Sequence, residues 1–167
     1  DLTFSISGGS DITATLDGSD VSFSAPTNFN GSETFTITVS DSELTDSQNI
    51  TVTVNAVNDA PVATTGLSGT TTEDQTVVIS LSGNDIDGDN LSFTLDADAT
   101  NGTVTLDGSL ATYTPDVNYN GDDSFTFSVS DGSESSSASV SLSVSAVNDA
   151  PVLASVSDGS WEEDGLG

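Results

Sequence analysis

The chain has 167 residues, including 27 aspartate and glutamate residues but no lysine, arginine, histidine or cysteine, so its formal net charge is −27. Nucleic acids and anionic membrane surfaces are bound through cationic side chains, and cysteine, lysine or histidine catalysis needs residues that are absent here. We therefore expect no nucleic-acid partner. Because no run of about 18 apolar residues occurs, we also expect no membrane insertion.

The sequence repeats itself at an interval of ninety residues. Residues 57–62 read Val-Asn-Asp-Ala-Pro-Val, and the same six residues recur at 147–152. A fixed period of this length indicates a tandem array. It divides the chain into a partial repeat over 1–61 without its N-terminal strands, a complete repeat over 62–151 and the start of a third repeat over 152–167.

Apolar residues alternate with serine and threonine throughout the complete repeat, and turn residues separate these segments. This pattern predicts an all-β fold of tandem seven-stranded antiparallel sandwiches, about 90 residues each. We expect the first strand around 62–67 and the others around 77–81, 91–95, 104–106, 111–113, 125–129 and 140–144. The core is predicted to hold the aromatic residues Phe4, Phe35, Phe93, Tyr113, Phe125 and Phe127.

Seven strands that run alternately up and down place each loop at one of two poles. Asp85, Asp87, Asp89, Asp107, Asp131 and Glu134 are expected at the lower pole, where the linker enters. Glu73, Asp74, Asp96, Asp98, Asp116, Asp122 and Asp123 are expected at the upper pole. In the partial repeat Asp11 and Glu33 should face Asn58 and Asp59 across the junction.

Carboxylates gathered at a junction repel one another, by about 1 kcal/mol for a pair 4 Å apart in water and several times more near a protein surface. Calcium fits the all-oxygen donor set, magnesium fits less well, and zinc or copper would need nitrogen or sulfur ligands. The densest cluster is the segment 85–90, Asp-Ile-Asp-Gly-Asp-Asn, in which we expect Asp85 and Asp87 to bind and Asp89 to remain solvated.

As an ordered set, these motifs resemble a bacterial cadherin-like or Ig-like tandem repeat of large secreted RTX-type adhesins. The resemblance rests on Asn-Asp-Ala-Pro-Val at 58–62, the segment 84–89, Asn-Gly-Asp-Asp at 120–123 and Val-Ser-Asp-Gly at 129–132. It implies calcium ions between successive domains. The implied metal ligands are Asn58, Asp59, Asp85, Asp87 and Asp131 at the upstream joint, with Glu33 facing them, and Glu73, Asp122, Asp123, Asn148 and Asp149 at the downstream joint.

The predicted function is that of calcium-stiffened spacer repeats in a large secreted or cell-surface bacterial adhesin involved in cell adhesion and biofilms, without enzymatic activity. Neighbouring repeats of the same chain are the expected partners, and a carbohydrate or protein ligand would bind elsewhere in the array. Attachment to a membrane would come from other parts of the protein. Two alternatives remain: a carbohydrate- or protein-binding adhesin module, and an accessory domain of a secreted enzyme.

Overall fold

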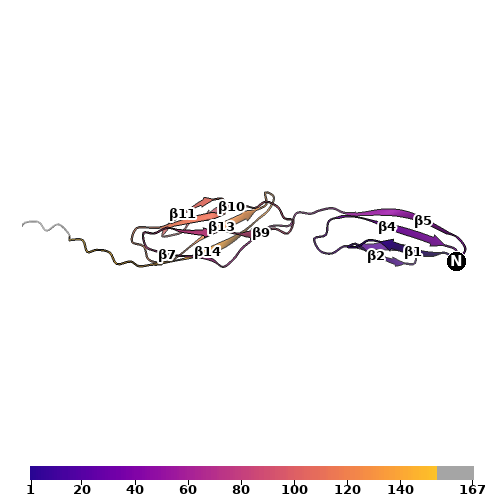
Figure 1. Ribbon diagram of the computed structural model, residues 1–167, viewed down its shortest axis with the longest axis horizontal. Helices are drawn as coiled ribbons and strands as arrows, with labels where there is room; N and C mark the ends of the chain where they lie inside the picture. The colour runs from indigo at the N-terminus through magenta and orange to yellow at the C-terminus, as the bar shows by residue number, and fades with distance from the viewer. Residues whose placement is uncertain (154–167) are drawn as a thin grey trace, which may run out of the picture.

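The computed structural model describes residues 1–153, and every regular element in that range is a β-strand. Two β-units follow one another along the long axis of the molecule and are joined by an extended linker (Figure 1). No helix in the described range is long and apolar enough to cross a membrane. The predicted all-β class is confirmed.

The complete repeat consists of two facing sheets and a short ribbon. Its strands are β6 (Val62–Ala63), β7 (Leu67–Thr72), β8 (Val77–Ser80), β9 (Gly83–Asn84), β10 (Ser92–Ala97), β11 (Gly102–Asp107), β12 (Leu110–Pro115), β13 (Gly121–Ser130) and β14 (Ser135–Ser145). One sheet has the order β10-β13-β14-β7, the other has the order β11-β12-β8, and β6 pairs with β9.

The first predicted strand, around 62–67, is wrong in its extent. It is two strands in different sheets: β6 pairs antiparallel with β9, and β7 lies parallel to β14. Gly66, with a φ of 76°, lets the chain change direction between them. One strand pair of the sandwich is therefore parallel rather than antiparallel. Strand β7 also continues to Thr72, through residues that lie between the predicted strands around 62–67 and 77–81.

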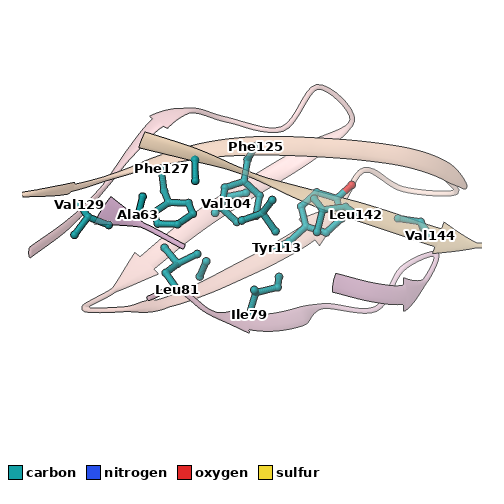
Figure 2. Packing of buried hydrophobic residues seen from close by; sticks show 13 residues of the cluster. Ala63, Ile79, Leu81, Val104, Tyr113, Phe125, Phe127, Val129, Leu142 and Val144 are labelled. Atoms are coloured by element: carbon teal, nitrogen blue, oxygen red, sulfur yellow. The ribbon is translucent and has the colours of Figure 1, made fainter. Parts of the chain in front are cut away.

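The core of the complete repeat lies between its two sheets. Phe125 and Phe127 from β13 and Tyr113 from β12 are fully buried, as their place in the period-two pattern predicts. They meet Val104, Ile79 and Leu142 from the neighbouring strands (Figure 2). The side chains that alternate with the core residues are mainly serine and threonine on the outer face, so that Ser128 lies opposite Ser137 and Thr126 opposite Ser139.

The partial repeat contains equivalents of β10 to β14 at an offset of about ninety residues. These are β1 (Thr3–Gly8), β2 (Thr13–Asp17), β3 (Asp20–Ser24), β4 (Gly31–Ser40) and β5 (Thr45–Val54). They form a sheet of order β1-β4-β5 and a separate β2-β3 hairpin. Phe35 is fully buried, but Phe4 is 39% exposed, so the prediction that Phe4 lies in the core is wrong: the described chain supplies this repeat with no counterpart of β7 or β8.

Replacing Gly69 with valine should destabilise the complete repeat. A Cβ atom at Gly69 would lie 2.9 Å from Ile79 Cγ1 and 3.2 Å from Leu142 Cδ2. Overpacking of this kind costs about 1–3 kcal/mol. Both tyrosines, Tyr113 and Tyr119, belong to this repeat, so tyrosine emission during urea unfolding follows it alone. The control is Ser68→Val, an exposed position on the same strand; equal unfolding midpoints for the two variants would contradict the packing.

Candidate metal site at the junction between repeats

The loop between β9 and β10 places three carboxylates together. One oxygen from each of Asp85, Asp87 and Asp89 lies within 4.8 Å of the others. Asp85 Oδ1 accepts the backbone N–H groups of Asp87 at 2.9 Å and Asp89 at 3.3 Å, which folds the loop around this side chain. Gly88, with a φ of 80°, makes the sharp turn that brings Asp89 back toward Asp85.

The second oxygen of Asp85 has no partner. Asp85 Oδ2 is buried and accepts no hydrogen bond from the described residues. A buried carboxylate oxygen without a donor is costly, because the charge has lost its water and gained nothing in return. This oxygen lies in a cluster of three aspartates and is free to coordinate a cation. The all-oxygen donor set and its geometry therefore fit a cation that binds oxygen ligands.

The linker is fastened to the same end of the complete repeat. The backbone N–H of Asp59 donates to Asp87 Oδ2 at 2.7 Å. The amide nitrogen of Asn58 donates to Asp131 Oδ2 at 2.9 Å, in the turn between β13 and β14. Asn58, Asp59, Asp85, Asp87 and Asp131 therefore lie together at the lower pole, where the alternation of strands placed them.

Asp131 is held in a tight turn by hydrogen bonds. Its Oδ1 accepts the N–H groups of Ser133 and Glu134. The bond from the Glu134 N–H, followed by those from the Asn58 amide and the Ser133 N–H, lowers the pKa of Asp131. Asp41, ninety residues earlier, accepts from Leu44 and Glu43 in the same way, and its pKa is also lowered. Both turns thus favour a charged aspartate at neutral pH.

Asp89 is exposed, as expected for a solvated residue, and its carboxylate also lies beside those of Asp85 and Asp87. The spacing of the three residues predicts this grouping, because alternate residues of an extended segment point to one side. A loop folded around Asp85 Oδ1 strengthens that convergence.

The partial repeat faces the junction through a loop that was not predicted to take part. Asn28, Phe29 and Asn30 line a hollow together with Asp59 and Asp87, and Asn30 also lines an adjoining hollow with Asp87 and Asp89. Asn28 has a φ of 60°, which asparagine tolerates better than most residues. Asparagine is uncharged, so a search for acidic motifs does not find this loop.

Glu33 lies outside this cluster because its carboxylate serves its own repeat. It accepts the N–H groups of Ser10, Asp11 and Ile12 and the hydroxyl of Ser10. The bond from the Ser10 hydroxyl, followed by that from the Asp11 N–H, lowers the pKa of Glu33 from 4.5 to about 2. The sequence placed Glu33 at the correct pole, and its role as a metal ligand stays a prediction.

Asp123, ninety residues after Glu33, likewise accepts backbone N–H groups and a hydroxyl within its own repeat. Its carboxylate accepts the N–H groups of Thr100 and Asn101 and the hydroxyl of Tyr113. Burial alone would raise its pKa and is the largest single effect, but these bonds and the Ser124 N–H together outweigh it, so the pKa is lowered. Asp122 is exposed and points away from Asp123, as consecutive strand residues do.

The downstream pole is organised by Glu73. Its buried carboxylate accepts the N–H of Val147, and its own N–H donates to Ser145 O at 2.9 Å. Asn148 donates to Asp149 O at 3.1 Å, which repeats the contact of Asn58 with Asp59 O at 3.4 Å. The roles predicted for Glu73, Asp122, Asp123, Asn148 and Asp149 at the next junction stay predictions, because the residues they would face lie beyond residue 153.

Comparisons with known proteins agree with this architecture. A family model described as bacterial Ig domain matches residues 1–53 and 58–143. The chain belongs to this bacterial Ig domain family, whose members are typically non-catalytic and usually lie in extracellular or surface proteins. No curated protein matches the chain.

Solved structures with similar folds include animal cadherins. The chain is 18% identical to human protocadherin-24 EC1-2, with a TM-score of 0.59, covering 88% of this chain and 82% of that one. For Drosophila N-cadherin EC1-4 the identity is 13% and the TM-score 0.45, covering 87% and 42%. An endo-fucoidan hydrolase of glycoside hydrolase family 107 is 27% identical with a TM-score of 0.45, covering 88% of this chain and 24% of the hydrolase. The chain thus spans about a quarter of that enzyme's length. The protocadherin likeness confirms the Ig- and cadherin-like fold.

Acidification should weaken the complete repeat through Asp123. Because the pKa of Asp123 is lowered in the folded state, its hydrogen bonds stabilise the fold above the ordinary aspartate pKa, and this contribution is lost as the pH falls through the folded-state value. Asp123→Asn should cost about 1–3 kcal/mol at neutral pH, since Asn accepts these donors less well. It should also flatten the loss of stability in acid, measured by tyrosine emission in urea. Asp107→Asn, in an exposed hairpin turn, is the control. If it changed the stability and its acid dependence as much as Asp123→Asn does, the role given to the hydrogen bonds of Asp123 would be wrong.

Proposed function

We propose that these repeats are calcium-stiffened spacers in a large secreted or cell-surface bacterial protein of the adhesin type. The observation that carries the proposal is the buried, unpartnered Oδ2 of Asp85 inside the cluster with Asp87 and Asp89. It lies where the linker enters the complete repeat, so an ion bound there acts on the geometry between repeats.

Calcium suits this cluster better than other common ions. It accepts six to eight oxygen ligands in loose geometry, whereas magnesium requires a tight octahedron and zinc favours nitrogen or sulfur. We assign the ion to Asp85, Asp87 and Asp89. Asp59, whose N–H binds Asp87, and Asp131, which accepts the Asn58 amide, are the candidates for further oxygen ligands. An affinity on the order of 10⁻⁴ to 10⁻³ M, as in extracellular modules, is expected.

The ion would stiffen the joint in two ways. It would offset the repulsion between carboxylates that the chain itself has no cationic side chains to offset. It would also hold the linker, whose Asp59 N–H already binds Asp87. Asn30 of the partial repeat lines a hollow with Asp87 and Asp89, and a bond from its side-chain oxygen to the ion would carry the restraint across the junction.

Calcium should raise the melting temperature of the chain. For a dissociation constant of about 1 mM, about 10 mM calcium stabilises the folded state by about 1.4 kcal/mol, or roughly 5–10 °C for a domain of this size. The measurement is thermal unfolding followed by tyrosine emission, with calcium or with EDTA at matched ionic strength. Asp85→Asn combined with Asp87→Asn should remove most of the shift.

The matched control is Asp17→Asn with Asp20→Asn, which changes the net charge equally in a hairpin turn away from the junction. This pair should leave the calcium shift in place. The proposal fails if calcium and EDTA give the same melting temperature, or if both double variants lose the shift equally, because general charge screening would then explain it.

Stiffening across the joint has a test of its own. In small-angle scattering, calcium should lengthen the particle and narrow its range of shapes, because a bound ion restrains the linker. Asn30→Ala should reduce this effect while leaving most of the thermal shift, since the three aspartates belong to the complete repeat. Asn49→Ala, on the outer sheet face beside Thr36, is the control. A wild-type scattering curve in Asn30→Ala would exclude bridging by this residue.

A further inference from the structure

Strand β2 has one unpaired edge. Among residues 1–153 it pairs only with β3, across the two-residue turn Gly18-Ser19. Its equivalent in the complete repeat, β11, likewise ends the sheet β11-β12-β8. An open edge at this place is therefore a property of the repeat, and it carries backbone N–H and C=O groups that can pair with another strand.

The hairpin determines which residues of β2 point to that edge. Asp17 and Asp20 close the two-residue turn and therefore exchange backbone hydrogen bonds. Hydrogen-bonded and non-hydrogen-bonded pairs alternate along an antiparallel ladder, so Thr15 also bonds to β3. Ala14 and Leu16 lie at the alternate positions and direct their N–H and C=O groups outward, so they supply the free donors and acceptors of this edge.

In the complete repeat a carboxylate occupies the corresponding edge. Val104, ninety residues after Ala14, donates its N–H to Asp98 Oδ1 at 2.8 Å. The same oxygen accepts the Ala99 N–H at 2.9 Å, which holds the Asp98 side chain in place. A charged side chain on a sheet edge opposes pairing with another strand. Strand β11 is therefore capped.

The partial repeat lacks this cap. Gly8 stands ninety residues before Asp98 and has no side chain to offer the edge. A hollow of about 270 Å³ lies beside Ala14 instead, with Ile6 and Phe35 among the residues that line it. The edge of β2 is thus open and has partly apolar space next to it.

We propose that β2 pairs with β2 of a second copy of the chain, antiparallel and centred on Thr15. In this register Ala14 of each copy lies opposite Leu16 of the other, and each such pair exchanges both of its backbone N–H···O bonds. Strand addition of this kind draws its affinity from the main chain. The contact is self-complementary, so it closes into a symmetric pair of copies.

The side chains favour the same occupant. Ala14 and Leu16 lie on the half-buried face of β2, so Leu16 of the incoming strand comes beside Ala14, where the hollow next to Phe35 gives its side chain room. Thr13 lies opposite Asp17, so no two carboxylates of the paired strands face each other directly. A second copy therefore suits the edge in hydrogen bonding, shape and charge.

The contact is expected to be weak. Each copy carries a net charge of −27, and a single pair of edge strands is small beside the roughly 1,200 Å² or more that stable interfaces bury. Association should therefore strengthen with protein concentration and with sodium chloride, which screens the repulsion. None of the paired residues belongs to the aspartate cluster, so a test in EDTA can fail independently of the calcium proposal.

The test is a concentration series of the full chain in EDTA, at low and high sodium chloride, by light scattering. The mass should rise from 16.8 kDa toward twice that value as concentration and salt increase. Amide hydrogen exchange, read by NMR, should slow at Ala14 and Leu16 in step with the mass. A monomeric mass at every concentration would overturn the proposal, and so would a rising mass that leaves these two amides unprotected.

Two matched variants make the test specific. Thr15→Asp places like charges opposite each other at the centre of the contact and should abolish association. Thr105→Asp makes the same change at the exposed position ninety residues later, on the capped strand β11, and should leave association intact. Equal effects of the two variants would contradict the proposal, because general repulsion or another surface would then explain the association.

A third variant provides a rescue. Thr15→Lys alone should also fail to pair, because two lysines then face each other. An equimolar mixture of Thr15→Lys and Thr15→Asp should regain the mass of a pair, since opposite charges meet at the centre of the contact. A mixture that stays monomeric under conditions in which the unmodified chain associates would rule out the pairing of β2 about Thr15.

Discussion

A chain without cationic side chains can neutralise its carboxylates only with backbone N–H groups, hydroxyls or ions from solution, and this constraint organises the structure. Most loops use the protein's own donors. Glu33 and Asp123 each gather neighbouring N–H groups, and Glu73 takes the N–H of Val147. The loop at Asp85 differs, because one carboxylate oxygen accepts N–H groups of the loop while the other is buried and has no partner within residues 1–153. Carboxylates in the other loops are thus stabilised by hydrogen bonds, whereas the carboxylates at the joint between repeats are left to repel one another.

The lack of cationic side chains also bears on where acidic residues lie in the strands and loops. Serine and threonine occupy most outer positions of β13 and β14, while the acids gather mainly at strand ends. A neutral face of hydroxyls leaves the β13-β14 pair free of directly opposed like charges, which would oppose strand pairing. Burial then differs between the repeats: Val140, whose strand pairs with β7, is fully buried, whereas Ile50, at the same place in the partial repeat, is half-buried.

The fold could be read from the sequence because its period of two survives in almost every strand, as at Phe125, Phe127 and Val129. Alternation of strand direction also placed Asp85, Asp131 and Asn58 at one pole. Two features lay beyond such reasoning. The change of sheet at Gly66 depends on a single backbone angle, and the hydrogen bonds of Glu33 and Asp123 depend on loops that are distant in sequence. Whether the oxygens at the joint hold an ion cannot be read from spacing, because the same residues also make ordinary turns.

The parallel contact of β7 with β14 would determine how the complete repeat responds to a pull on its two ends. Such a force would enter through the linker before β6 and leave through the segment after β14, at the opposite pole. The two strands are thus drawn past each other along their common direction, and their six paired positions are loaded together rather than one at a time. A strand pair sheared in this way resists pulling far better than a hairpin peeled open from its turn. The parallel β7-β14 pair is therefore the part of the repeat that would bear such a load.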